Sequence, residues 1–181
     1  MEKYILGDKS KNRILQILSD IDFKSDEEQI LDKFKFLIQT SIHYDRLTIS
    51  SKMDIGLNSV IKLTDGLKDA FEKGTKFPTN GSLHGLPIIS GETVNTPQWN
   101  DSHANMVRFH AKENDDIGFQ SVLGVPLLIE KESRGSIFLE RLKDKPFSDI
   151  EAKDLEIIGR VLGATLNWLI EYEKIYKNAT H

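Results

Sequence analysis

Three segments of the chain space their apolar residues at the period of an amphipathic helix. Apolar side chains recur every three or four residues over residues 11–21, 30–42 and 150–172. Ser25-Asp26-Glu27-Glu28 precedes the second segment, and Ser148-Asp149-Ile150-Glu151 spans the start of the third. Both sequences have the form of a capping box. The last helix is predicted to run toward Asn178, roughly 30 residues, against a mean of about 11–12. An apolar stripe that is longer than its own domain can cover indicates pairing with another chain.

Shorter segments alternate in the manner of strands or are rich in apolar residues. They cover residues 46–51, 59–64, 119–130 and 135–141. Turn residues at 53–58 and 132–135 predict that the four segments form two hairpins, the third being broken by Gly124 and Pro126. Helices at both ends and two hairpins between them favour an α+β domain with a mainly antiparallel sheet.

The tract between the hairpins has little regularity. Pro78-Thr79-Asn80-Gly81 predicts a turn. Residues 82–91 predict a short or irregular helix, with Ser82 as its N-cap and Gly91 at its end, and residues 101–113 predict a helix. Long irregular tracts in a compact domain are usually functional, so residues 79–116 are expected to close over a ligand.

Composition bounds the class of protein. The 181 residues fit one domain, and a net charge of −4 argues against a dedicated nucleic-acid binder. The longest apolar stretch, Val122–Ile129, is far short of the ~20 residues that a membrane span needs, and the first residues lack the apolar core of a signal peptide. These features predict a soluble cytoplasmic protein without a membrane segment.

The sequence contains no cysteine and no recognisable catalytic motif. Disulfides, Cys-ligated zinc, iron–sulfur clusters and a catalytic thiol are therefore excluded. Nucleophile elbows, phosphate-binding glycine loops and zinc-protease motifs are also absent, and the five histidines have no metal-ligand spacing. We expect a protein that is not an enzyme, with no catalytic residue, no metal and no required cofactor.

One stretch resembles a known family. Asp115-Asp116-Ile117-Gly118-Phe119-Gln120-Ser121 leads into a strand that ends in Val125-Pro126, which is similar to a pattern of GAF domains. Gly135–Leu139 resembles the glycine-started strand of that family, Phe147-Ser148 the start of its terminal helix, and residues 81–94 its segment of two spaced glycines. The order and spacing of these motifs extend the resemblance over about residues 25–172.

The resemblance implies an architecture and a role. It implies a central antiparallel sheet with the N- and C-terminal helices on one face and a ligand pocket under loops and short helices on the other. Residues 1–24 then form an N-terminal helical extension, residues 25–172 the GAF-like sensor domain, and residues 173–181 the end of a C-terminal signalling helix. Such domains sense small molecules and, as homodimers through their terminal helices, control an output domain such as a nucleotide cyclase, histidine kinase or HD hydrolase.

The composition narrows the choice within the family. Bilin-attaching members and free methionine sulfoxide reductases need a thiol, which this chain lacks. Cyclic-nucleotide-binding members carry an Asn-Lys…Phe…Asp-Glu motif, and the corresponding positions here are Glu140-Arg141, Phe147 and Glu151-Ala152. The structural ion pair of that motif is expected to survive as Arg141–Glu151.

A cyclic nucleotide, cAMP or cGMP, is the leading candidate ligand. The resemblance places its site at Thr64, Asp65, Leu83, His84, His110, Asn114, Ile117 and Ser121. The amides of Leu83 and His84 and uncharged donors would hold the cyclic phosphate, Asp65 and Asn114 would read the base, and Ser121 would add one hydrogen bond. Arg46 and Arg108 are predicted to be surface residues. The alternative is a dimerisation or scaffold domain whose pocket holds no ligand.

Overall fold

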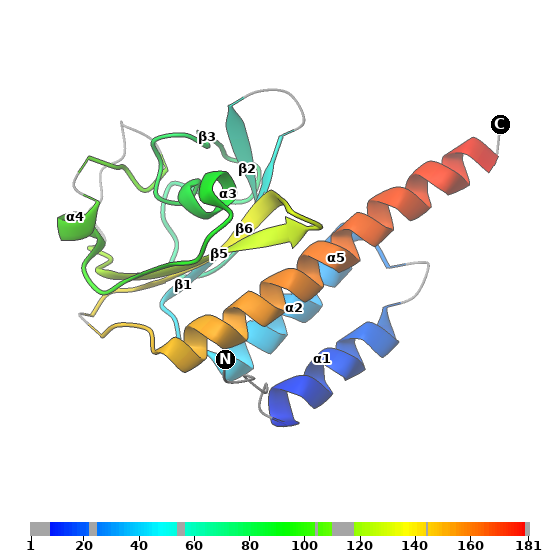
Figure 1. The fold of residues 1–181 in the computed structure, drawn as a ribbon, viewed down its shortest axis with the longest axis horizontal. Coiled ribbons are helices and arrows are strands. Elements are labelled where there is room, and N and C mark those ends of the chain that lie inside the picture. The colour runs from blue at the N-terminus through cyan, green and yellow to red at the C-terminus, as the bar shows by residue number, and fades with distance from the viewer. Residues whose placement is uncertain are drawn as a thin grey trace.

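A six-stranded antiparallel sheet divides the structure, with long helices on one face and short helices and loops on the other (Figure 1). The computed structural model describes residues 8–21, 25–53, 57–103, 105–109, 118–143 and 145–179. Its elements are α1 Asp8–Asp20, α2 Glu27–Ser41, β1 Arg46–Lys52, β2 Asn58–Gly66, β3 Lys76–Pro78, α3 Leu86–Ser90, β4 Val94–Thr96, α4 Trp99–Ser102, β5 Ser121–Ile129, β6 Glu132–Arg141 and α5 Asp149–Ala179. The predicted α+β class and antiparallel sheet are confirmed.

The strand order is β3-β2-β1-β6-β5-β4, so the two predicted hairpins lie side by side in the sheet. Each hairpin pairs internally, β1 with β2 and β5 with β6. The hairpins join through β1 and β6, which are the two central strands. Side chains on these two strands are therefore covered on both faces, by helices on one side and by loops on the other.

The helical layer of α2 and α5 buries the main hydrophobic core. Alternate residues of the central strands, Leu47 and Ile49 in β1 and Ile137 and Leu139 in β6, face Phe34 of α2 and its neighbours. The outermost helix, α1, packs against α2 (Figure 1) and adds Ile14 to the same core. Among the described residues, no helix is both long enough and apolar enough to span a membrane.

A bulge in β2 sends two neighbouring apolar residues to opposite faces. Ile49 pairs with Leu63, but Ser50 pairs with Ile61, so β2 carries one extra residue at Lys62. Leu63 consequently joins the helical core, whereas Ile61 packs with Phe77 and Phe109 on the other face. This placement begins the second, smaller core beneath the loops.

The predicted cap of the second helix is shifted by one residue. The N-cap of α2 is Asp26, not Ser25, because the Gln29 amide donates to Asp26 Oδ1 at 2.8 Å and the Gln29 side chain accepts from the Asp26 amide at 3.2 Å. The capping box of α5 is confirmed. There the Ser148 amide donates to Glu151 Oε2 at 2.7 Å, and the Glu151 amide donates to Ser148 Oγ at 3.2 Å.

The β5–β6 hairpin differs from its prediction in two ways. Its turn lies at Glu130–Lys131, where Glu130 has a φ of 57°, so β6 begins at Glu132 and the turn predicted at 132–135 is wrong. β5 also runs through Gly124 and Pro126 with one irregularity after Pro126. Gly124 is required because an added Cβ would lie 2.4 Å from the ring of Phe138. The glycine therefore marks a packing contact within the strand.

The irregular tract is confirmed as irregular, but its helices differ from the prediction. Gly91 ends α3 in the left-handed conformation, as predicted, whereas the N-cap is Gly85 and Ser82 Oγ instead accepts from the Gly85 amide at 3.1 Å. The predicted helix over 101–113 is wrong for residues 105–109, because Val107 pairs in parallel with Ser82. Residues 110–113 and part of the first hairpin turn, 54–56, lie outside the described residues.

Candidate functional site

Five titratable side chains gather under the loops on the sheet face opposite the long helices. Arg46 and Glu140 lie directly opposite each other on β1 and β6, and the others come from the β2–β3 loop, the residues before α3 and the segment 105–109. We name this set, Arg46, Asp69, His84, Arg108 and Glu140, the buried charge cluster. Arg46, His84 and Glu140 are fully buried. Arg108 is 2% exposed, and the Asp69 side chain is 8% exposed.

Strand alternation explains how polar side chains become buried there. Leu47 and Ile49 face the helical core, so Arg46, Thr48 and Ser50 must face the other side. The same alternation in β6 turns Ser136, Phe138 and Glu140 to that side, where loops cover them. The prediction that Arg46 and Arg108 are surface residues is therefore wrong. The alternation of apolar residues around Arg46 indicates that its side chain faces the covered side of the sheet, which could have corrected this prediction.

The charges in the cluster are arranged so that each carboxylate lies near both arginines. Arg108 Nε lies 2.7 Å from Glu140 Oε1 and Arg108 Nη2 2.9 Å from Oε2. Asp69 lies 2.7 Å from Arg46 Nη1 through Oδ1 and 3.1 Å from Arg108 Nη2 through Oδ2. Arg46 Nε lies 3.6 Å from Glu140 Oε2. Within the named set, the two arginines and the two carboxylates thus carry equal and opposite charges.

The β2–β3 loop folds around the guanidinium of Arg46. Besides meeting Asp69, Arg46 donates to the carbonyl oxygens of Leu67, at 3.1 Å, and Phe71. The Phe71 amide in turn donates to Asp69 Oδ1 at 2.7 Å. Arg46 is therefore a buried anchor of this loop, through one acidic side chain and two backbone carbonyls.

His84 lies in an aromatic stack without a hydrogen-bond partner for either ring nitrogen. Its ring is sandwiched between Phe109 and Phe138, with centroids at 3.8 Å and 4.0 Å, and Nε2 lies 3.4 Å from Glu140 Oε1. Burial lowers the pKa of His84 to about 4, against the attraction of Glu140, so the imidazole is neutral at pH 7. Unpartnered buried polar groups are rare, and each one calls for an explanation such as a functional role.

Burial and ion pairing act in opposite directions on the charged members. Burial alone would raise the pKa of Glu140, but the contacts with Arg108 and His84 together outweigh burial and hold that pKa well below the usual range. Burial lowers the pKa of Arg46, while Asp69 and Glu140 oppose the change. Among the described residues, no group of three or more His, Asp or Glu side chains is placed to hold a metal ion.

The predicted phosphate-binding amides are already engaged in backbone pairing. The Leu83 amide donates to the Val107 carbonyl at 2.7 Å, and the His84 amide donates to the Arg108 carbonyl at 3.2 Å. Both residues are fully buried. A cyclic phosphate could reach these amides only if the segment 105–109 moved away from them.

The other predicted residues are divided between two faces. Thr64 is half-buried and pairs with Thr48, which faces the buried charge cluster's side of the sheet. Asp65 instead accepts from Gln39 Nε2 of α2 at 2.9 Å and from the Tyr44 hydroxyl at 2.7 Å. Its carboxylate therefore points to the helical side, away from Leu83 and His84, which corrects the expectation that Asp65 shares their site. Burial, reinforced by Asp65, raises the pKa of Tyr44.

Ser121 anchors loops at the start of β5. Its buried hydroxyl lies in donor range of the Pro97 carbonyl, at 2.9 Å, and of the Lys143 carbonyl, at 3.2 Å. Its hydrogen is thus used within the protein in this conformation. His110, Asn114 and Ile117 lie outside the described residues, and their assignment to a ligand remains a prediction.

The pair predicted from the motif resemblance is present. Arg141 Nη2 lies 2.6 Å from Glu151 Oε1, and the guanidinium stacks over the ring of Phe147 with its carbon 3.8 Å from the ring centroid. Arg141 also donates to the carbonyl oxygens of His43 and Pro146, at 2.8 Å and 3.1 Å. It therefore ties the start of α5 to the end of β6 and has a structural role.

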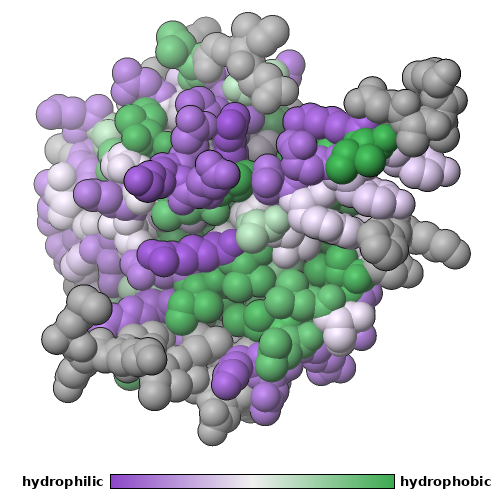
Figure 2. All heavy atoms as spheres, turned by 45° about the vertical axis from the view of Figure 1, so that its right-hand side comes forward, coloured by the Kyte–Doolittle hydropathy of each residue, from purple (hydrophilic) through white to green (hydrophobic). Residues whose placement is uncertain are grey.

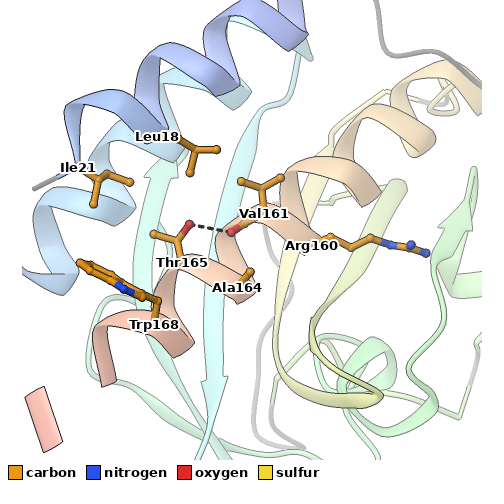
Figure 3. Close-up of a pocket in the computed structure, with 7 residues that line it drawn as sticks. All are labelled: Leu18, Ile21, Arg160, Val161, Ala164, Thr165 and Trp168. Atoms are coloured by element: carbon orange, nitrogen blue, oxygen red, sulfur yellow. Dashed lines mark hydrogen bonds between the residues drawn. The ribbon is translucent and has the colours of Figure 1, made fainter. Parts of the chain in front are cut away.

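The second candidate site is an apolar groove between α1 and α5 on the surface. Leu18 of α1 and Ile21, the residue after α1, face Val161, Ala164 and Trp168 of α5 across a groove of about 530 Å³ (Figure 3). Arg160 points away from α1 at one end of the groove (Figure 3), and the Thr165 hydroxyl donates to the Val161 carbonyl within α5. Figure 2 shows apolar side chains gathered in a patch on this side of the molecule.

Comparison with known proteins identifies the fold. No protein-family model matches the chain, and no curated protein matches its sequence. A GAF domain of a Coxiella burnetii phosphoenolpyruvate-protein phosphotransferase superposes with a TM-score of 0.71 at 17% identity, covering 91% of this chain and 96% of that one. The GAF domain of the Acinetobacter phosphotransferase gives 0.70 at 17% identity, covering 87% and 89%.

A third neighbour is an enzyme. Free methionine-R-sulfoxide reductase from Neisseria meningitidis, solved with its substrate, superposes with a TM-score of 0.67 at 15% identity, covering 97% of this chain and 98% of that one. The neighbours thus include an enzyme as well as GAF domains of phosphotransferases, and their shared feature is the architecture. The strand order, the helical layer and these superpositions show that the chain has the fold of a GAF domain.

Proposed function

We propose that this chain is a regulatory sensor module that binds a small cytoplasmic ligand on the face of the buried charge cluster and controls another domain through α5. The observation that carries the proposal is the cluster itself, with both nitrogens of His84 unpartnered. Buried ion pairs seldom stabilise a fold more than apolar side chains of similar volume would. Perturbed titratable groups gathered on one face are instead typical of functional sites.

The arrangement of the segments supports a route from ligand to output. Arg108 and the pairing of residues 107–108 with 83–84 tie the covering loops to β6, and β6 pairs with β5, on which α5 packs. A ligand that rearranged the covering loops would act on the sheet beneath α5. The Coxiella and Acinetobacter neighbours are GAF domains of larger proteins, which favours an output domain in a parent protein here as well.

Cyclic nucleotides, cAMP or cGMP, are the first ligands to test. A single negative charge and a polar base suit a face that contains two arginines and an unpartnered imidazole. Binding must open the contacts between residues 83–84 and 107–108, since those amides are engaged. We propose no catalytic step, because the chain has no cysteine and the cluster includes no activated nucleophile.

Calorimetric titration of cAMP and cGMP into the unmodified chain tests the ligand. Binding should come with slower hydrogen exchange over residues 83–109, where the covering segments close. Native mass spectrometry of protein purified from cells should reveal a retained ligand as added mass. Absence of heat, of thermal stabilisation and of changed exchange at millimolar nucleotide would discard both cyclic nucleotides.

A second candidate is a dimerisation or scaffold domain without a ligand. The observation that favours it is the engagement of the Leu83 and His84 amides, together with the balanced charges of the cluster. The exposed groove between α1 and α5 would then be the functional surface. A chain that dimerises but retains no small molecule from cells, and shows no exchange change with a ligand panel, would fit this candidate.

A further inference from the structure

Asp69 differs from its partners in the buried charge cluster in how it is attached. Arg46 and Glu140 belong to the two central strands, whereas Asp69 is presented by the loop 67–75. Its two oxygens serve two different arginines, Oδ1 at 2.7 Å from Arg46 Nη1 and Oδ2 at 3.1 Å from Arg108 Nη2. A two-oxygen anion bridging two guanidinium groups is the geometry by which arginines bind carboxylates and phosphates.

The balance of charge defines what could replace Asp69. Without its carboxylate, Arg46 and Arg108 contribute two positive charges and Glu140 contributes one negative charge, while His84 is neutral. Counted over these four side chains alone, the cluster would then hold one excess positive charge. One negative charge restores the balance, whereas a dianion would place a second negative charge beside the Glu140 carboxylate.

We infer that Asp69 occupies the place of a ligand's anionic group. The ligand carries one negative charge on a group with two terminal oxygens, a carboxylate or a phosphodiester, and this group displaces the Asp69 side chain from between Arg46 and Arg108. This inference rests on the proposed function and adds the group that is recognised and the residue that competes with it. His84, buried and unpartnered, supplies a hydrogen-bonding group for the rest of the ligand.

Displacement also provides a local conformational change. When Asp69 leaves, the Phe71 amide loses its acceptor, and Arg46 loses the one acidic contact that it has to the loop 67–75. Phe71 itself stacks on Phe109 at 4.8 Å, next to Arg108. Release of Asp69 therefore loosens two covering segments at once, the loop and residues 105–109.

The test uses Asp69→Asn, which keeps the size of the side chain and removes its charge, with Glu72→Gln as the matched control. Glu72 is exposed in the same loop. The probes are sodium formate and sodium dimethyl phosphate, compared with acetamide and with sodium chloride at equal ionic strength. We expect either anion to stabilise Asp69→Asn against thermal unfolding, with an apparent Kd at least tenfold lower than for the unmodified chain, while Glu72→Gln behaves as unmodified.

The outcomes separate the inference from the proposed function. If Asp69→Asn is unfolded without additives, recovery of its circular dichroism signal in formate or dimethyl phosphate is the expected result. The inference would be overturned if neither anion stabilised or refolded Asp69→Asn more than sodium chloride does. A preference for formate or for dimethyl phosphate assigns the group as carboxylate or phosphodiester.

Titration of cAMP and cGMP completes the design. A nucleotide that binds the unmodified chain with a Kd unchanged by Asp69→Asn would leave the proposed function standing and overturn the displacement of Asp69. Stabilisation of Asp69→Asn by small anions, without any nucleotide binding, would support the displacement and discard the cyclic nucleotides as ligands.

Discussion

Arg108 meets Glu140 through two parallel contacts, Nε to Oε1 at 2.7 Å and Nη2 to Oε2 at 2.9 Å, in a place that solvent barely reaches. The pair joins an irregular segment to a central strand of the sheet. Because Arg46 Nε also lies 3.6 Å from Glu140 Oε2, one carboxylate serves both arginines. The attachment of residues 105–109 to the sheet therefore depends in part on a single side chain of β6.

Glu140→Gln should destabilise the protein strongly. The amide removes the carboxylate that contacts both buried guanidinium groups, which keep Asp69 as a shared acidic partner. Breaking a buried ion pair from one side costs about 3–5 kcal/mol. Urea unfolding followed by circular dichroism measures the change in the free energy of unfolding.

Glu132→Gln is the matched control for that substitution. Glu132 pairs with Arg134 at 3.0 Å on the surface of the same strand, and exposed pairs contribute about 0–1 kcal/mol. Equal losses of stability in the two variants would mean that the cluster is hydrated and open in solution, contrary to the buried arrangement.

Gly163→Ala should destabilise the protein even though alanine is the better helix former by about 1 kcal/mol. A Cβ at position 163 would lie 2.9 Å from the Leu128 carbonyl oxygen, so α5 would have to move away from β5. Forced shifts of this kind cost about 1–3 kcal/mol. Thermal unfolding of the variant should show a lower midpoint than that of the unmodified chain.

Gly159→Ala provides the comparison on the same helix face. An added Cβ there meets Val125 Cγ2 at 3.1 Å and the Pro126 carbonyl at 3.2 Å, distances that smaller adjustments relieve. We expect a smaller loss than at position 163. A stabilising Gly163→Ala would show that α5 and β5 are less tightly packed than these distances indicate.

The sequence predicted elements well wherever a local pattern determined them. The stripe of the last helix, its Ser148–Glu151 cap and the Arg141–Glu151 pair all rest on residues close together in the chain. The cap of α2 was displaced by one residue because Ser25, Asp26, Glu28 and Gln29 offer two overlapping capping boxes.

The candidate site was harder to predict because it is assembled from distant segments. Asp69, Arg108 and Glu140 meet only through the sheet order and the folding of two irregular segments. The resemblance placed Asp65 beside the ligand, whereas its contacts with Gln39 and Tyr44 hold its carboxylate on the helical side of the sheet. In most proteins isolated arginines lie on the surface. That expectation failed here because Arg46 and Arg108 are both paired with carboxylates in the interior.

The groove between α1 and α5 predicts self-association, which belongs to the proposed function. Leu18 and Trp168 are 41% and 40% exposed at its rim, and Ile175 and Tyr176 continue the apolar surface beyond it. We expect sedimentation of the unmodified chain to show a dimer at tens of micromolar and Trp168→Glu to sediment as a monomer. The glutamate at position 168 would place a negative charge in the apolar contact between the two copies and so disfavour the dimer.

The control for self-association is Ile150→Glu on the same helix. Ile150 is 65% exposed and lies in the first turn of α5, far from the groove, so its substitution should leave the dimer intact. Leu169, a natural choice from the helical stripe alone, is buried in the main core and would test stability instead. A monomeric unmodified chain would remove the basis for signalling by a dimer of this chain.

His84 predicts a loss of stability between about pH 6.5 and 5. Burial lowers the pKa of His84 to about 4 in the folded chain, whereas the unfolded value is near 6.5. Between these values the unfolded chain binds a proton that the folded chain does not bind, so the free energy of unfolding falls as the pH falls. The stabilising contribution is complete above pH 6.5, and its loss should be on the order of 2 kcal/mol at pH 5.

His84→Phe isolates that contribution because phenylalanine keeps the stack between Phe109 and Phe138 and cannot titrate. The measurement stops at pH 5, since Glu140 has a lowered pKa and its own stabilising contribution is lost only as the pH falls below about 4.5. We expect urea unfolding of His84→Phe to lose less stability than the unmodified chain between pH 7 and 5. His43→Gln, which changes an exposed histidine, should follow the unmodified chain. Identical pH dependence in His84→Phe and the unmodified chain would mean that His84 takes up its proton in the folded state and that the cluster accommodates the added charge.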